Sequence, residues 1–514
     1  MLPLPFIEAS HIAASLSGTG LVLLAPGLYR RLDGAFVATR ALLLAGAAFS
    51  LAKGLDYEEA IVCLSLAALL QWTRSAFYRR TALLQQALTP SWTFSVAAAF
   101  LLAVWIGFFS YRHVEYRDDL WWHFALRGDA SRFLRGSVAA AILLMAAAVR
   151  RLFAPAAPLV ADPAPGDWAD VDRIVFQASR AEAMLAYTGD KRLLFTAARD
   201  AFLMYQVRGA SWIVMGDPVG PVGAWSELLW KIRGMADAAQ GRLLLYQIGA
   251  EALDLAIGMG LEIVKYGEEA VIDLPDFDLG TTLLRSLRKG ERRAARAGAA
   301  FEVIPAAGVG LVLGELKAVS DEWLHVKGRQ EKRFSLGRFD PDYLRRFDCA
   351  VVRQDGAIVA FANLWTLPNK RELSVDLMRH KADAPLNTMD FLFAHLLAWG
   401  KAQGYARFNL GLAPLSGIEG RRLAPAWARA AQLVFRHGER LYGFRGLRAY
   451  KEKFAPAWEP RYIAGPHGLA LVRALRDVTA LISDVRGPAK AAPPRPHERL
   501  PSLHLGRHAL PDAA

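Results

Sequence analysis

The chain has 514 residues, 54% of them hydrophobic, with a mean hydropathy of +0.19 and a formal net charge of +13. It is too apolar for an ordinary soluble protein and too polar for a pure transporter, which favours a membrane segment joined to a water-soluble domain. The charge favours nucleic acid or anionic lipid headgroups as partners, although such membrane proteins are often basic on their cytoplasmic side. Cys63 and Cys349 form neither a metal-binding spacing nor a disulfide framework, which indicates a reducing compartment for the soluble part.

Five apolar stretches occupy residues 1–152 and predict an α-helical membrane segment of about five transmembrane helices, because each approaches the roughly 20 residues needed to cross the hydrocarbon core. Arginines gather after the first, third and fifth stretches. The positive-inside rule then places the large C-terminal part in the cytoplasm, attached to a multi-pass segment in the inner membrane. No stretch carries a row of ionisable residues, which favours an anchor or a lipid-access surface over a transport pathway. The stretches lie at about 9–29, 34–53, 57–73, 92–111 and 134–151.

Residues 153–168 are rich in alanine and proline and predict a linker. Helix and strand signals then alternate, which is typical of an α/β or α+β domain, and the pattern repeats from about residue 300. We expect two similar halves, 169–300 and 301–486, and a disordered tail, 487–514. The predicted helices are 170–186, 250–259, 310–327 and 388–403. The predicted strands are 193–195, 202–205, 211–215, 243–248, 301–304, 349–353, 358–365, 372–378 and 407–410, with turns at 216–218 and 355–356.

The densest basic segment runs from Arg285 to Arg296. On a helix, its basic residues recur at i, i+3 and i+4 and form one broad cationic face. Guanidinium groups suit phosphate, so Arg288 and Arg292 are candidates for binding an RNA backbone or lipid headgroups. A solvated surface helix is the alternative, and Gly290 weakens the helix prediction.

A second cluster lies in the predicted strand 372–378, where Glu372, Ser374, Asp376 and Met378 alternate and therefore share one face. Two carboxylates and a hydroxyl interrupt an otherwise apolar pattern. This combination suits a general base or a site for a cationic substrate group. An exposed strand face is the alternative interpretation.

A third stretch, Gly443 to Phe454, interleaves basic and aromatic residues and contains Arg448 and Lys451. Such interleaving is typical of segments that hold phosphates or bases, although an ordinary amphipathic surface segment shows it too. The sequence has no Walker A motif, no dinucleotide-binding glycine motif after a strand, no paired-histidine zinc motif and no nucleophile elbow. We therefore expect no cofactor, no metal and no covalent catalysis.

Several strings together resemble one family. The chain is similar to the C-terminal synthase part of the multiple peptide resistance factor proteins, which are phosphatidylglycerol lysyl- or alanyltransferases of bacterial membranes. The resemblance covers roughly residues 170–465, with the strings in the same order as in the family. They are 189–192, 211–221, 334–340, 361–365, 374–379, 389–393, 408–417 and 446–454.

The resemblance implies a tandem acetyltransferase-like (GNAT) fold. It also implies transfer of an aminoacyl group from aminoacyl-tRNA to phosphatidylglycerol, and resistance to cationic antimicrobial peptides. The family's active-site residues match Asp376 and Arg379 in one string and Lys451 in another. The expected partners are therefore aminoacyl-tRNA, phosphatidylglycerol and the membrane.

An aminoacyl ester is already activated, so the implied reaction requires neither ATP nor a nucleophilic side chain, and positioning supplies much of the rate. Asp376 would assist deprotonation of the glycerol hydroxyl or bind the α-ammonium group. Arg379 and Lys451 would hold phosphate or the developing oxyanion. The remaining candidate substrate-binding residues are Glu372, Ser374, Arg448, Asn409, Arg288 and Arg292.

The amino acid itself stays open between lysine and alanine. Glu372 near Asp376 favours a lysyl ammonium group, whereas a small pocket would suit alanine. The alternative functions are an acyl-CoA-dependent GNAT N-acyltransferase, for which the pyrophosphate loop is missing, and a non-catalytic membrane-tethered binding module.

Overall fold

The computed structural model describes residues 17–18, 20–54, 57–81, 150, 153–155, 160–328, 330–418 and 444–483. The chain forms two compact units, Met1–Leu159 with Met235–Gly241, and Val160–Gly234 with Arg242–Ala514. The predicted spans 92–111 and 134–151 and the predicted tail 487–514 lie outside the described residues. The predicted division of the soluble part at residue 300 stays a prediction.

The first unit contains helices α2 (Asp33–Gly54) and α3 (Tyr57–Trp72), which pack against each other. The stretch Asp33–Leu51 of α2 is long and apolar enough to cross a membrane, and among the described residues it is the one stretch that passes this test. It matches the predicted span 34–53, and α3 matches the predicted span 57–73 but has only 16 residues. A five-helix segment therefore stays a prediction.

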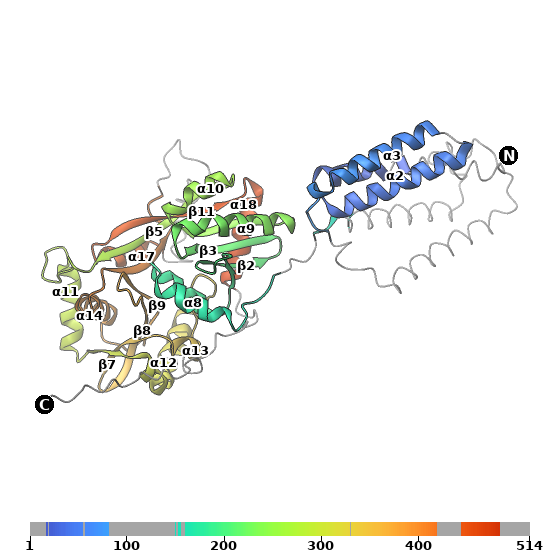
Figure 1. The fold of residues 1–514 in the computed structure, drawn as a ribbon. Helices are drawn as coiled ribbons and strands as arrows, with labels where there is room; N and C mark the ends of the chain where they lie inside the picture. Colours follow the sequence, from blue (N-terminus) through green and yellow to red (C-terminus); the bar gives the residue numbers. More distant parts are fainter. Residues whose placement is uncertain are drawn as a thin grey trace, which may run out of the picture. The chain divides into compact units, whose positions relative to one another are not determined.

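An eleven-stranded mixed sheet organises the second unit, with strand order β1-β2-β3-β4-β11-β5-β10-β9-β8-β7-β6 (Figure 1). Strand β3 pairs with β4, and β10 with β9, in parallel; the other neighbours are antiparallel. The strands are β1 (Arg192–Phe195), β2 (Phe202–Arg208), β3 (Ser211–Val219), β4 (Arg242–Ile248), β5 (Glu262–Asp273), β6 (Ala300–Ile304), β7 (Cys349–Gln354), β8 (Ala357–Thr366), β9 (Glu372–His380), β10 (Arg407–Pro414) and β11 (Ala457–Gly465).

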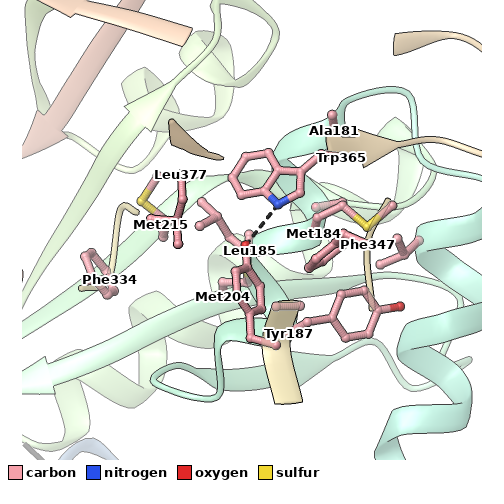
Figure 2. Close-up of a cluster of buried hydrophobic side chains, with 14 of the residues drawn as sticks. Ala181, Met184, Leu185, Tyr187, Met204, Met215, Phe334, Phe347, Trp365 and Leu377 are labelled. Atoms are coloured by element: carbon pink, nitrogen blue, oxygen red, sulfur yellow. Dashed lines mark hydrogen bonds between the residues drawn. The ribbon is translucent and has the colours of Figure 1, made fainter. Parts of the chain in front are cut away.

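Helices cover both faces of the sheet, which is why several strands are apolar along their whole length. In β8, Phe361 and Trp365 belong to one core cluster, and Ala360 and Leu364 to the other. Figure 2 shows part of the first cluster around Trp365 and Met204. The helices of the second unit are α8 (Asp167–Phe176), η2 (Ala181–Thr188), η3 (Val222–Ala224), α9 (Trp225–Ala238), η4 (Ala250–Ala252), α10 (Leu253–Gly258), α11 (Arg285–Arg296), α12 (Ala306–Lys327), α13 (Pro341–Leu344), α14 (Thr388–Ala402), α17 (Phe444–Glu452) and α18 (Leu469–Ile482). The end of α9, from Met235, belongs to the first unit.

The two faces carry different helices. Residues of α8, η2, α12 and α18 enter the first core cluster, whereas residues of α11, α14 and α17 enter the second. We call these the η2 face and the α14 face. Helices α11 and α14 lie side by side, as Figure 1 shows.

All of the strands predicted from the sequence are confirmed, but two predictions near the η2 face are wrong. The predicted helix 170–186 ends at Phe176, because Arg180 is extended (φ −129°, ψ 136°), and a 3₁₀ helix follows. The predicted turn 216–218 lies inside β3, which continues to Val219. There the pairing with β2 shifts register, and Gly216 has φ +68°, so these residues form a bulge rather than a turn.

Gly290 gives a stability test of the α11–α14 contact. A Cβ at position 290 would lie 2.6 Å from Oδ2 and 3.1 Å from Cβ of Asp390, which is buried on α14. Gly290→Ala should therefore destabilise the protein by about 1–3 kcal/mol through overpacking. Gly314→Ala, at an exposed helical position with open space around it, should stabilise it by up to about 1 kcal/mol. The melting temperature of the full chain in detergent checks both variants. Equal shifts of the melting temperature, with the same sign in both, would contradict the close packing of Gly290 against Asp390.

Candidate active site

A β-bulge in β9 determines which of the predicted site residues lie together. The pairing of β8 with β9 shifts register so that Asp376 and Leu377 together oppose Asn363. The backbone N–H of Leu377 donates to the side-chain Oδ1 of Asn363 on β8 at 2.8 Å instead of to a backbone carbonyl of that strand. Leu377 therefore packs on the η2 face, and Met378 packs on the α14 face. The expectation that Met378 shares a face with Asp376 is wrong, because strict alternation fails at the bulge.

Asp376 is 8% exposed and holds the loop that precedes α13. Its Oδ1 accepts from the backbone N–H of Gly337 at 2.9 Å, and its Oδ2 accepts from the Tyr343 hydroxyl at 2.7 Å. Burial raises the pKa of the Asp376 carboxyl, although these two hydrogen bonds oppose the shift. The Tyr343 hydroxyl also accepts from Nε1 of Trp365 at 2.9 Å (Figure 2). A Cβ at Gly337 would lie 1.8 Å from Oδ2 of Asp376, so glycine leaves the room that the carboxylate occupies.

Arg379 is buried in a bidentate ion pair. Its guanidinium donates to Oε1 and Oε2 of Glu331 at 2.8 and 2.7 Å, and also to Oγ of Ser320. The guanidinium lies over the Trp323 ring, 5.4 Å from its centroid. These contacts fix the residues before α13 against α12, next to the loop that Asp376 holds.

Lys451 lies in a different environment, at a bulge in β10. Its Nζ donates to the carbonyl oxygens of Gly411 and Leu412 at 2.8 and 2.9 Å. Both carbonyls lie where the pairing of β10 with β5 shifts register, and Gly411 has φ +82°. Burial lowers the pKa of Lys451 to about 7, and the charge of Glu269 opposes this. A neutral amine that donates both N–H groups keeps its lone pair free, so Lys451 can accept a proton at neutral pH.

Asn409 and Ser374 lie next to this bulge. The Ser374 hydroxyl donates to the backbone carbonyl of Asn409 at 2.8 Å, and Oδ1 of Asn409 accepts from the N–H of Gly411 at 2.7 Å. Nδ2 of Asn409 donates to Oε2 of Glu269 at 3.3 Å. Asn409 and Ser374 thus support the backbone that presents carbonyl groups to Lys451.

Glu372 has no exposed surface, and both of its carboxylate oxygens are engaged. One accepts from the N–H of Ala181 at 2.6 Å, and the other accepts from Arg407 at 2.7 Å. Arg407 also donates to Oε1 of Glu459 at 2.9 Å. The contacts of Glu372 therefore join η2 to β9 and β10.

The remaining predicted residues are basic and lie farther out. Arg448 donates to Glu268 at 2.6 Å and to Ser416, and it lies over the Trp458 ring at 4.3 Å. Arg288 donates to the Leu279 carbonyl at 2.9 Å, and Arg292 is exposed. No described carboxylate forms an ion pair with the exposed α11 cations, which are Arg285, Lys289, Arg292, Arg293 and Arg296.

Arg461 was not a predicted site residue, yet it lies at the centre of a buried charge network. It is 1% exposed, and its Nη2 and Nη1 donate to Glu269 at 2.7 Å and to Asp217 at 3.2 Å. Arg180 also donates to Glu269, at 2.8 Å, and to Glu459, at 3.1 Å. Burial alone would raise the pKa of Glu269, but Arg461 and Arg180 outweigh it and lower that pKa.

A pocket opens beside this network, with about 410 Å³ of empty space when its open side is included. Among its lining residues are Arg180, Glu182, Met204, Asp217, Trp225 and Glu251. Gly216 leaves room for Glu182, since a Cβ there would lie 3.0 Å from the Glu182 carboxylate. Burial raises the pKa of Glu182 to about 7, Arg461 and Arg180 oppose the shift, and Glu269 and Asp217 add to it.

Two of these missed residues come from strands that were not predicted, namely Glu269 in β5 and Arg461 in β11. A carboxylate or guanidinium inside a strand-like apolar run is the signal that could have marked them. Glu182 carried no such signal, because it fits the exposed side of a helix in the sequence. Among the described residues, no group of three or more histidine, cysteine or acidic side chains is placed to hold a metal ion.

Comparison with known proteins gives a consistent result. A family model described as the C-terminal part of phosphatidylglycerol lysyltransferase matches residues 173–465. The phosphatidylglycerol lysyltransferase of Bacillus subtilis is 36% identical over 323 residues, 62% of this chain and 37% of that protein. The Staphylococcus haemolyticus protein of the same name is 35% identical over 280 residues, 54% of this chain and 33% of that protein. The matched part thus spans only about a third of these relatives' length.

Two solved structures are similar to this chain over 63% of its length. The crystal structure of the C-terminal domain of a putative lysylphosphatidylglycerol synthetase from Agrobacterium fabrum has 43% identity and a TM-score of 0.57, and it covers 63% of this chain and 100% of that one. The structure of L-PGS from Bacillus licheniformis has 34% identity and a TM-score of 0.57. The match covers 63% of this chain and 98% of that one. The family model covers more than half of the residues. The chain therefore belongs to the family of phosphatidylglycerol lysyltransferase C-terminal domains.

Proposed function

We propose that this chain transfers an amino acid, with lysine favoured, from aminoacyl-tRNA to phosphatidylglycerol in the cytoplasmic membrane. The family match across residues 173–465 carries this proposal, because Asp376, Arg379 and Lys451 all lie within it. The product lipid is less anionic than phosphatidylglycerol, or cationic when lysine is transferred. Resistance to cationic antimicrobial peptides follows, because such peptides bind anionic surfaces.

The reaction is a transesterification that Lys451 can serve from a fixed position. A glycerol hydroxyl of the lipid attacks the aminoacyl carbonyl, a new ester bond forms, and the bond to the terminal ribose oxygen breaks. Lys451 in its neutral form accepts the hydroxyl proton and returns it to the leaving ribose oxygen. The carbonyl groups of Gly411 and Leu412 hold the amine in place throughout.

Asp376 has three candidate roles within this proposal. As a carboxylate it binds the α-ammonium group or assists deprotonation of the glycerol hydroxyl. Its hydrogen bonds to Gly337 and Tyr343 allow a third role, in which it only positions the loop before α13. Arg379, already paired with Glu331, fixes that loop from the other side.

The phosphate groups of the substrates need cationic surface, and α11 supplies it. Its exposed arginines have no described acidic partner, so they are available to tRNA or headgroup phosphates. Arg448 is tied to Glu268, which makes it a weaker candidate for this contact than Arg292. The apolar helix Asp33–Leu51 supports attachment to the membrane.

The assay for this proposal uses the full chain in phosphatidylglycerol vesicles with each charged tRNA in turn. We expect an aminoacylated lipid with lysyl-tRNA and loss of product after ribonuclease treatment. Product that persists after ribonuclease and requires acyl-CoA would instead support an N-acyltransferase. A binding module would give no product under either condition.

Lys451 predicts a particular pH dependence. The amine is charged below its pKa of about 7 and neutral above it, so the turnover number should rise between pH 6 and pH 8. Lys451→Arg keeps the charge but cannot lose its proton, and it should lower kcat by about 100-fold or more. Lys453→Arg, a matched change at a lysine that pairs with Asp390, should leave the rate and its pH profile intact. Full activity of Lys451→Arg would exclude this base.

Asp376 is tested by comparing two variants. Asp376→Asn should fold and lose about 100-fold in kcat if the carboxylate acts on the substrate. Tyr343→Phe keeps the carboxylate and removes only one hydrogen bond, so it should retain most of the activity. Equal losses in both variants would assign Asp376 to loop positioning, and full product from Asp376→Asn would remove it from the mechanism. Asp355→Asn, in the β7–β8 turn, serves as the control.

A further inference from the structure

Two carboxylates that line the pocket beside the buried network, the exposed Glu251 and the half-buried Glu182, have no direct partner among the described residues. No hydrogen bond or ion pair joins the Glu182 side chain to any residue that the structure describes. Asp217, by contrast, accepts from the N–H of Gly249 at 2.9 Å and pairs with Arg461 at 3.2 Å. Glu182 therefore faces the pocket with a charge that no neighbour satisfies by direct contact.

The charge balance around the pocket favours a cation. Glu182, Asp217 and Glu251 line it, and Arg180 is the basic residue among its lining side chains. Arg180 is itself engaged by Glu269 and Glu459. A half-buried carboxylate in such surroundings gains most from a bound ammonium or guanidinium group, because the ligand supplies the missing counter-charge.

The other walls of the pocket are apolar. Met204 from β2, Val219 from β3 and Trp225 from α9 line it, and each is largely buried. A small hydrated cation would gain nothing from such walls, whereas an alkyl chain ending in an ammonium group would pack against them. The lining therefore fits an alkylammonium group with its charged end at Glu182.

The pocket is also linked to the reacting groups. Glu269 pairs with Arg180, which lines the pocket, and with Arg461, and its charge acts on Lys451. The same carboxylate thus contacts the pocket wall and influences the candidate base. A substrate whose ester lies near Lys451 could place its side chain on the other side of this ion pair.

We propose that this pocket binds the side chain of a lysyl group, with Glu182 as the counter-ion of its terminal ammonium. The assignment rests on the aminoacyl transfer proposed above and adds the residue that selects the amino acid. Glu372, the carboxylate that the sequence suggested for this role, is occupied by Arg407 and Ala181.

The test is the preference of the full chain, in phosphatidylglycerol vesicles, for lysyl-tRNA over alanyl-tRNA. Glu182→Gln should lower the ratio of the two kcat/KM values by roughly tenfold or more, with the alanyl reaction changed by less than about twofold. Asp254→Asn removes an exposed carboxylate on neighbouring α10 and should leave the ratio unchanged. An unaltered ratio in Glu182→Gln, or a wild-type preference for alanyl-tRNA, would overturn the pocket assignment while leaving lipid aminoacylation intact. Wild-type protein that modifies no lipid with any charged tRNA would instead overturn the proposed function.

A second measurement keeps the test decisive if Glu182→Gln does not fold. Lysine methyl ester and norleucine methyl ester share the same four-carbon stem, and only the lysine compound carries a terminal ammonium group. In the wild-type protein, lysine methyl ester should compete with aminoacyl-tRNA at a concentration roughly tenfold or more below that of norleucine methyl ester. Equal inhibition by the two esters would show that no carboxylate of the protein binds the terminal ammonium group of the side chain.

Discussion

The buried guanidinium of Arg461 is the constraint around which the centre of the second unit is built. Removing such a charge from water costs several kcal/mol, so the group is stable only where acidic partners meet it with good geometry. Glu269 and Asp217 supply that contact from β5 and β3. Because Arg461 itself lies on β11, this one side chain ties together three strands that are distant in the sequence.

From Glu269, a series of ion pairs in which acidic and basic side chains alternate extends across the sheet. Arg180 bridges Glu269 and Glu459, and Arg407 bridges Glu459 and Glu372. Every acidic group in this series has a basic partner. Glu182 lies beside this series without an ion pair to a described residue, as does the exposed Glu251, so the pocket carries acidic groups that no described neighbour neutralises by direct contact.

Irregular pairing gives the functional groups their directions. A bulge in β10 presents carbonyl groups to Lys451, and a bulge in β9 turns Arg379 to the same face as Asp376. A third irregularity lies in β3 around Asp217, which pairs with Arg461. At the bulge in β9, the departure from regular alternation places Arg379 on the face where a regular strand would place Met378.

Much of the fold could be predicted from the sequence, since apolar runs and glycine turns mark most strands. The basic segment from Arg285 to Arg296 does form a helix, α11, although Gly290 weakens that prediction. The bulges could not be predicted, because the contact of Asn363 and the positive φ of Gly411 can be interpreted only when the neighbouring strand is known. The family strings directed attention to Asp376 and Lys451. The Arg461 network was missed because its members come from separate segments, and only the pairing of β11 with β4 and β5 brings them together.

The position of β11 has a consequence for biosynthesis. The strand lies between β4 and β5, although about 190 residues separate it from β5 along the chain. Until the ribosome has released the segment 457–465, these two strands lack their shared neighbour and expose unpaired backbone edges. Early termination upstream of β11 would therefore leave the open edges of β4 and β5 free to pair with other chains, which is a route to aggregation.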